Sequence, residues 1–221
     1  MLNSTELNER YEVIGIFKEL SVGGRLIRTR PEAFICKKGI AYRDMADQKA
    51  DAVMIMLNPG SCSPVSEELF DGWKKAKPDS TQYQLMRLME EQRWEKLTIL
   101  NLSDLCEGNS KEFEVLVKTC EREGVAHSRF LANPSEWKKI ISSANVLLYG
   151  WGASPNARRM ANSYGLLDVE NILVSYGKQP IAAWDKTKKY PRHPFPRILV
   201  KCEEWLSDMV ASINTVETNK I

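Results

Sequence analysis

The sequence predicts an α/β domain in three layers, αβα, with helices on both faces of a central sheet. Short uncharged runs typical of buried strands occur at 53–57, 97–102, 146–149 and 172–174. Segments with helical spacing separate these runs, and this alternation predicts a four-stranded, mostly parallel sheet. The 221 residues suit a single domain. We expect an N-terminal extension at 1–50, a core at 51–213 and a flexible tail at 214–221.

The first of these strands ends in a distinctive turn. Apolar residues fill 53–57 and are followed at once by Asn58, Pro59 and Gly60. An amide at the carboxyl end of a buried strand stands where open α/β sheets bind their ligands. Pro59 fixes one backbone dihedral and Gly60 permits an unusual one, so the chain can turn sharply while Asn58 stays in place. The alternative is an ordinary strand followed by an Asx turn.

Two other regions are read from their turn residues. Segments 11–20 and 26–35 resemble a strand or short helix followed by a strand, joined at the Gly23-Gly24 turn. We expect this part to wrap around the core sheet. The long segment 61–78 contains Phe70 and Trp73, and long loops inside a domain are usually functional.

Capping residues mark the helices. Asp79 and Ser80 precede a helix at 81–93. Ser110 starts a helix that Gly124 ends. Asn133, followed by proline, starts another. Further helices are expected at 155–164 and 198–213.

Composition excludes several classes of protein. The five cysteines are scattered without a Cys-x-x-Cys pair, and there are two histidines, which argues against a disulfide framework or a zinc site. No apolar run reaches the roughly 18–20 residues of a membrane span. A net charge of +2 does not by itself indicate nucleic-acid binding. We expect a cytoplasmic protein, favoured as a monomer, with no metal, cofactor or membrane partner.

Polar or unusual residues follow each predicted strand. Asn58 and Asn101 end two of them, Gly150-Trp151-Gly152 follows the third, and the fourth leads to a basic loop containing His193. Singly, Asn101 is typical of a turn, Trp151 of a core and His193 of a surface. Because parallel strands end at one edge of a sheet, these residues are expected to converge on a pocket.

The ordered motifs Leu57-Asn58-Pro59-Gly60, Ile99-Leu100-Asn101-Leu102, Leu147–Gly152 and His193-Pro194-Phe195-Pro196 resemble the uracil-DNA glycosylase superfamily. The first motif is most similar to that of the mismatch-specific thymine/uracil branch. The same motifs also resemble a bacterial and phage family of unknown function. The resemblance spans roughly residues 50–200.

This resemblance implies roles for single residues. Asn58 would position the water that attacks C1′ of the sugar, and His193 would donate a hydrogen bond to the base as it leaves. Asn101 would pair with the edge of the flipped base. The pocket would be completed by Leu57, Pro59, Gly60, Trp151 and a stacking ring, Phe70 or Trp73.

DNA would be the partner. Phosphates would meet Lys186, Lys188, Lys189, Arg192 and Arg197, and Phe195 would act as a wedge beside the extruded nucleotide. Phe195 stands where the superfamily motif has serine, and Gly60 leaves room for a bulkier base than uracil. The resemblance therefore implies a DNA glycosylase that acts on an unusual, damaged or modified base, with a role in DNA repair or antiphage defence.

Three alternatives stay open. The chain could hydrolyse N-glycosidic bonds of free nucleosides or nucleotides. It could bind nucleic acid or bases without catalysis. The short motifs could also match by accident in an unrelated α/β domain.

Overall fold

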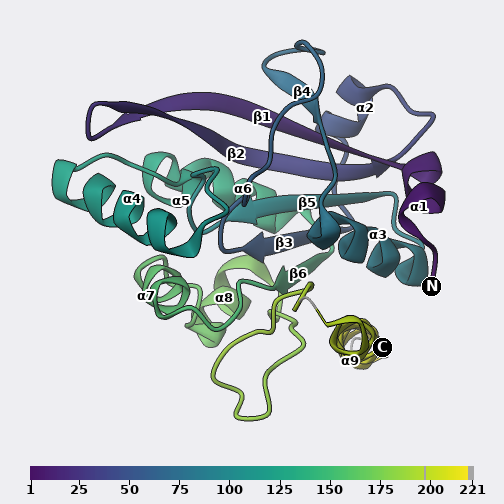
Figure 1. Ribbon diagram of the computed structural model, residues 1–221. Coiled ribbons are helices and arrows are strands. Elements are labelled where there is room, and N and C mark those ends of the chain that lie inside the picture. The colour runs from purple at the N-terminus through teal and green to yellow at the C-terminus, as the bar shows by residue number, and fades with distance from the viewer. Residues whose placement is uncertain (197, 219–221) are drawn as a thin grey trace.

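The computed structural model describes residues 1–196 and 198–218 and shows one sheet flanked by helices (Figure 1). The sheet has six strands in the order β4-β1-β2-β5-β3-β6. In chain order they are β1 (Tyr11–Val22), β2 (Arg25–Lys37), β3 (Ala52–Met56), β4 (Trp73–Ala76), β5 (Lys96–Asn101) and β6 (Val146–Tyr149). The predicted α/β class is confirmed.

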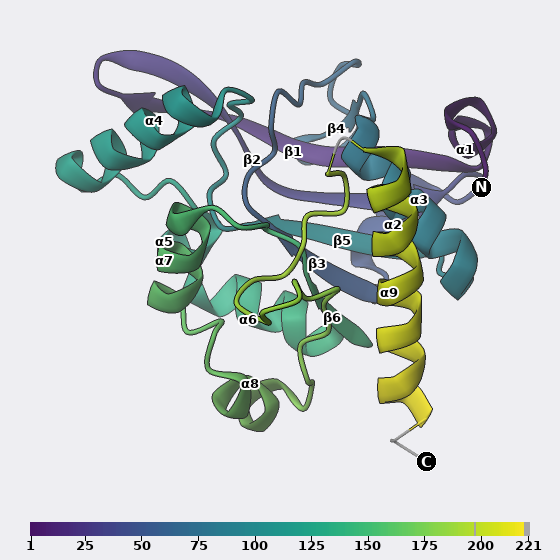
Figure 2. The same cartoon turned by 60° about the horizontal axis from the view of Figure 1, so that its bottom comes forward.

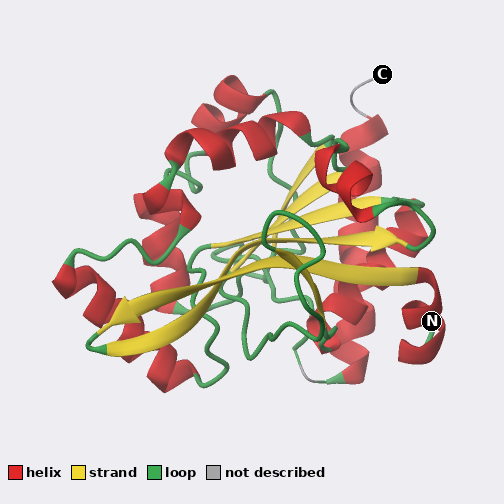
Figure 3. Ribbon diagram, turned by 90° about the horizontal axis from the view of Figure 1, so that it is seen from above, coloured by secondary structure: helices red, strands yellow, loops and turns green. Residues whose placement is uncertain are grey.

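The sheet is mixed rather than mostly parallel. β3 pairs in parallel with β5 and β6, whereas β1, β2 and β4 join by antiparallel pairing. The predicted four-stranded, mostly parallel sheet is therefore wrong. The cause is the hairpin of β1 and β2, because β2 pairs with β5, with Ala33 opposite Ile99. The N-terminal segment thus widens the sheet, and Figure 3 shows the long hairpin reaching beyond the other strands.

The strand predicted at 172–174 is part of helix α8 (Val169–Tyr176). A short apolar run cannot by itself distinguish a strand from a turn of helix. Here Ile172 is buried while Val174 is 86% exposed, as expected for a helix with one side on the core. The place beside β6 is taken by Ile181, which forms a single parallel bridge with Leu148.

Helices cover both faces of the sheet. One core cluster includes residues of α1 (Ser4–Arg10), α3 (Ser80–Gln92) and α9 (Leu199–Thr218). Figure 2 shows α9 beside α3. The other cluster includes residues of α4 (Ser110–Glu123), α5 (Arg129–Ala132), α6 (Pro134–Ser143), α7 (Pro155–Ser163) and α8. The short helix α2 (Tyr42–Asp47) packs with β1, β2 and β4 through a third cluster.

Two of the predicted caps, Asp79 and Gly124, are confirmed. Asp79 forms a capping box with the first turn of α3, and Gly124 ends α4 with a φ of +67°. Asn109, one residue before the predicted Ser110, caps α4 with its side chain. Asn133 precedes α6 but makes no side-chain cap bond.

Helix α9 runs to Thr218 and takes in residues 214–218, which were expected to belong to a flexible tail. Residues 219–221 lie outside the described part of the chain. No helix of the described residues has the length and apolar character needed to cross a membrane.

Candidate functional site

A cavity of about 100 Å³ lies at the carboxyl ends of the parallel strands, and we call it the strand-end cavity. Asn58, Asn101 and His193, which were predicted to converge, all line it. The other described residues in its wall are Arg30, Met56, Pro59, Gly60, Asp79, Thr81, Gln82, Leu85 and Ile99. Since a water occupies roughly 30 Å³ of liquid, the cavity has room for about three waters or one small ring.

The amide of Asn58 is held by a neighbouring loop. Its Nδ2 donates to the main-chain oxygens of Glu107, at 2.6 Å, and Leu105, at 3.4 Å. Both amide protons are thereby engaged, which leaves Oδ1 as the group that can accept from a ligand or water. Gly108 follows in the same loop and packs against Ser61, whose exposed Oγ would lie 2.1 Å from a Cβ at Gly108 and can rotate away.

Asn101 ends β5 and is 1% exposed. Its Nδ2 lies 3.5 Å from the main-chain oxygen of Arg30, to which it donates. This contact fixes which side of the amide carries the oxygen. Within the described chain, Oδ1 has no hydrogen-bond partner. A buried polar atom left in this state costs about 1–3 kcal/mol, which a ligand in the cavity would recover.

His193 reaches the cavity from the loop between α8 and α9. The main-chain N–H of Phe195 donates to its Nδ1 at 3.1 Å, and the main-chain oxygen of Phe195 lies 3.2 Å from the same atom. The N–H can only donate, so Nδ1 accepts and the neutral ring carries its proton on Nε2. The ring is thus oriented with Nε2–H as a donor.

The turn after β6 gives this loop its place. The N–H of Gly152, whose φ is +80°, donates to the main-chain oxygen of Pro191 at 3.1 Å. A Cβ at Gly150 would lie 3.3 Å from Cδ of Pro194 and 3.0 Å from the sulfur atoms of Met54 and Met56. The Gly-Trp-Gly motif therefore lets the histidine loop pack on the ends of the central strands.

The remaining pocket residues predicted from the sequence lie in several places. Gly60 lines the cavity with a φ of +63° and open space around its missing side chain. Leu57 lines a separate hollow instead. Trp151 is 2% exposed and packs on Tyr149, with ring centroids 4.4 Å apart, so it belongs to the core.

Phe70 and Trp73 are not among the described residues that line the cavity. They stack on each other, and Trp73 packs on Phe34 with ring centroids 4.9 Å apart. Trp73 begins β4, which pairs with β1 at the edge of the sheet away from β3. The prediction that one of these rings stacks on a base in the cavity is therefore corrected. The N-terminal hairpin lies between them and Asn58.

The basic loop is only partly open to solvent. Lys186, Lys188 and Lys189 are exposed. Arg192 forms an ion pair with Asp208 of α9, so its guanidinium is already neutralised. Phe195, expected to act as a wedge, is half-buried, and Arg197, also expected to meet phosphate, falls outside the described residues.

Asp185 organises the turn that carries these lysines. Its carboxylate accepts hydrogen bonds from main-chain N–H groups of Thr187, Lys189 and Tyr190. Desolvation raises the pKa of Asp185, but these bonds outweigh it and bring the value to about 2. The loop therefore has a defined shape, with its lysines pointing outward.

Arg30 was missed by the sequence analysis. It is 2% exposed and lines the strand-end cavity from β2. The antiparallel pairing of β2 with β5 brings its main-chain oxygen to Asn101. Charged residues at 28, 30 and 32 give no sign of which one lines a cavity, so only the strand register could identify it.

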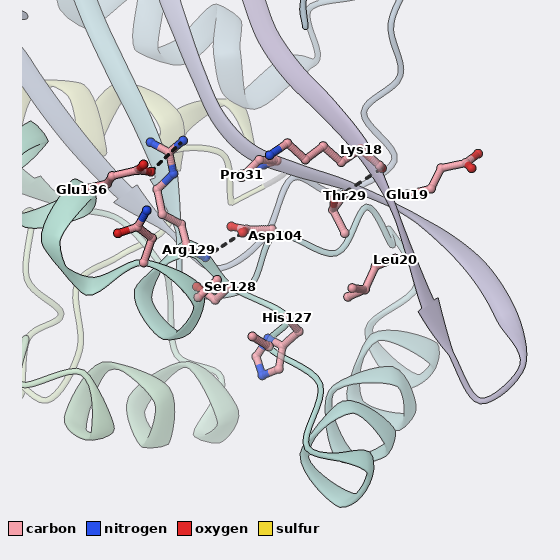
Figure 4. A pocket seen from close by; sticks show the side chains of 13 residues that line it. Lys18, Glu19, Leu20, Thr29, Pro31, Asp104, His127, Ser128, Arg129 and Glu136 are labelled. Carbon is pink, nitrogen blue, oxygen red and sulfur yellow. Dashed lines mark hydrogen bonds and ion pairs between the residues drawn. The ribbon is translucent and has the colours of Figure 1, made fainter.

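A second hollow, of about 350 Å³, lies beside β2 (Figure 4). Asp104 lines it, accepting from the main-chain N–H of Arg129 at 2.7 Å through Oδ2. Its Oδ1 has no partner among the described residues. Burial raises the pKa of Asp104 to about 8, although the charges of Arg129 and Arg30 oppose the shift. The carboxyl is therefore largely protonated at neutral pH.

The described residues contain no group of three or more His, Cys, Asp or Glu side chains placed to hold a metal ion. The cysteines are free thiols.

Comparison with known families adds one finding. Residues 42–195 match the family described as "Protein of unknown function (DUF1643)". The chain belongs to this family. No curated protein and no solved structure matches it. The part matched to DUF1643 contains Asn58, Asn101 and His193, whereas Arg30 precedes it.

Proposed function

We propose that the strand-end cavity is the active site of a DNA glycosylase-like hydrolase. It would cleave the N-glycosidic bond of an unusual, damaged or modified base that is flipped into the cavity. The observation that supports this most is the meeting of Asn58, Asn101 and His193 in one wall, from three separate parts of the chain. Their motifs resemble those of the uracil-DNA glycosylase superfamily in the same order.

The side-chain orientations suit this chemistry. Oδ1 of Asn58 accepts a hydrogen bond from the attacking water and orients it, because both amide protons are held by the loop at 105–107. The water oxygen bonds to C1′ as the bond from C1′ to the base nitrogen breaks. One water proton ends on the departing base. Nε2–H of His193 stabilises the negative charge on a base oxygen, and Asn101 Oδ1 accepts an N–H of the base.

The test is release of free base from DNA carrying uracil, damaged or phage-modified bases. We expect His193→Ala to lower the rate by about 10²–10³, the usual effect of losing one donor to a developing oxyanion. Asn58→Ala should lower it comparably. Asn162→Ala, on the exposed side of α7, serves as control and should leave the rate unchanged. Full activity in either cavity variant would overturn the assignment.

A second candidate is hydrolysis of free nucleosides or nucleotides. The ion pair of Arg192 with Asp208 favours it, since it reduces the positive charge available to a DNA backbone. Turnover of mononucleotides without measurable DNA affinity would select this candidate. Salt-sensitive DNA binding that is lost when Lys186, Lys188 and Lys189 are neutralised together, with no base release, would instead indicate a binding module.

A further inference from the structure

Arg30 is buried in the wall of the strand-end cavity, where its nearest influence on a carboxyl is the charge effect on Asp104 and no ion pair forms among the described residues. Its Nη1 donates to Sγ of Cys62 at 3.0 Å, and its Nε has no partner among the described residues. No ion pair within 4.0 Å involves it in this part of the chain. An arginine cannot lose its proton, so the positive charge persists. Burying such a charge unpaired is costly, which indicates a missing anion.

The fold makes room for this arrangement. A Cβ at Gly15 of β1 would lie 3.2 Å from Cδ and 3.4 Å from Cγ of Arg30. A larger residue at Gly15 would therefore press on the arginine stem. The hairpin thus holds the buried arginine against the cavity.

Other groups at the cavity also favour a negative ligand. Thr81 and Gln82 belong to the first turn of α3, whose N-terminus carries partial positive charge. Asp79 is the one carboxylate among the described lining residues; it is exposed and accepts from the N–H of Gln82 at 2.9 Å. Asn101 Oδ1 is an unpartnered acceptor, so the ligand must also carry an N–H or O–H donor besides its negative charge.

We propose that the strand-end cavity binds its ligand through an oxyanion, a carboxylate or phosphate, that Arg30 holds by charge-assisted hydrogen bonds. Oδ1 of Asn101 accepts an N–H from the same ligand. Two sources can supply this chemistry, an acidic substituent on a base ring or the phosphate of a nucleotide. The inference rests on the proposed function only in placing the anionic ligand in the cavity that would hold the flipped base. Its test measures binding and needs no turnover.

Calorimetry on the full chain tests this with two matched ligand pairs. The first pair is 6-carboxyuracil against uracil, and the second is deoxyuridine 5′-phosphate against deoxyuridine. We expect the anionic member of one pair to bind at least about tenfold more tightly, as charge-assisted hydrogen bonds allow. Preference in the first pair identifies a carboxylate on the base, and preference in the second identifies a nucleotide phosphate.

Three variants assign the preference to one side chain. Arg30→Met should abolish it, whereas Arg25→Met, an exposed position on the same strand, should leave it intact. Arg30→Lys keeps the charge but loses the fork of donors, so it should keep a reduced preference, and it replaces Arg30→Met if that variant does not fold.

Equal binding of both members of each pair by the wild-type protein would overturn the inference. So would a preference that survives Arg30→Met. The two proposals fail separately. Anion preference without base release refutes only the glycosylase assignment, whereas release of base with no anion preference refutes only the role of Arg30.

Discussion

Asn58→Asp is the substitution that tests most directly how the site is built. In this structure the Asn58 side chain donates two hydrogen bonds, to the main-chain oxygens of Glu107 and Leu105. A carboxylate has no proton to donate and would face two carbonyl oxygens. The change therefore removes both bonds and leaves an uncompensated charge beside them.

The cost follows from these contacts. Two hydrogen bonds contribute a net stability of about 1–3 kcal/mol, and an unsatisfied, partly buried carboxylate adds about 1 kcal/mol or more. We expect Asn58→Asp to lower the free energy of unfolding by about 2–4 kcal/mol at pH 8. The two carbonyls raise the pKa of the introduced carboxyl. At pH 5 its protonated form can donate one bond, so the loss should shrink by about 1 kcal/mol.

Urea unfolding at pH 5 and pH 8 measures this for the wild-type protein, Asn58→Asp and Asn58→Ala. The alanine variant loses the same bonds but introduces no charge, so its loss of stability should not depend on pH. The reasoning would be refuted if the aspartate variant matched the wild type at pH 8. It would also be refuted if the stability difference between them were the same at both pH values.

Three further outcomes are expected. Gly108→Ala would place a Cβ 2.1 Å from Oγ of Ser61, but this exposed hydroxyl can rotate away, so urea unfolding should show a loss of stability of at most about 1 kcal/mol, and a larger loss would show that the loop cannot relax. Because burial raises the pKa of Asp104 from 3.8 to about 8, its contribution to stability is fully present below pH 3.8 and is lost as pH rises toward 8. In the wild-type protein, this should lower the free energy of unfolding by about 2–3 kcal/mol between pH 6 and 8, as measured with urea, and Asp104→Asn should remove the decrease. Parallel pH profiles of the wild type and the variant would contradict this. Arg30→Met should leave the free energy of unfolding unchanged or raise it by about 1–2 kcal/mol in the same assay, whereas a loss above about 2 kcal/mol would show that the guanidinium is structural.

Local patterns predicted most helices and the central strands because capping and burial act over a few residues. Asp79 and Gly124 mark helix ends through contacts within one turn, and the runs at 53–57 and 146–149 are apolar throughout. The partner of β2 could not be read in this way. Its pairing with β5 joins residues 60 to 66 positions apart, and nothing in the sequence of either strand specifies the other.

The candidate site shows the same division. Asn58 and Asn101 could be placed together because each directly follows a strand, and parallel strands share one edge. Phe70 and Trp73 were placed near them only by closeness in sequence, which the course of β4 makes irrelevant. Arg30 gave no sequence signal, since its burial depends on the space left by Gly15 of another strand.

The cavity therefore draws on two parts of the chain with different consequences. The region matched to DUF1643 contributes Asn58, Asn101 and His193, the groups that could orient water and polarise a base. The N-terminal hairpin, outside that region, contributes Arg30 and with it a fixed positive charge. A neutral amide pair and an imidazole would accept many bases, whereas an unpaired buried guanidinium penalises every ligand that brings no anion. The two proposals thus divide the cavity: the matched core would carry out the reaction, and the hairpin would select the ligand.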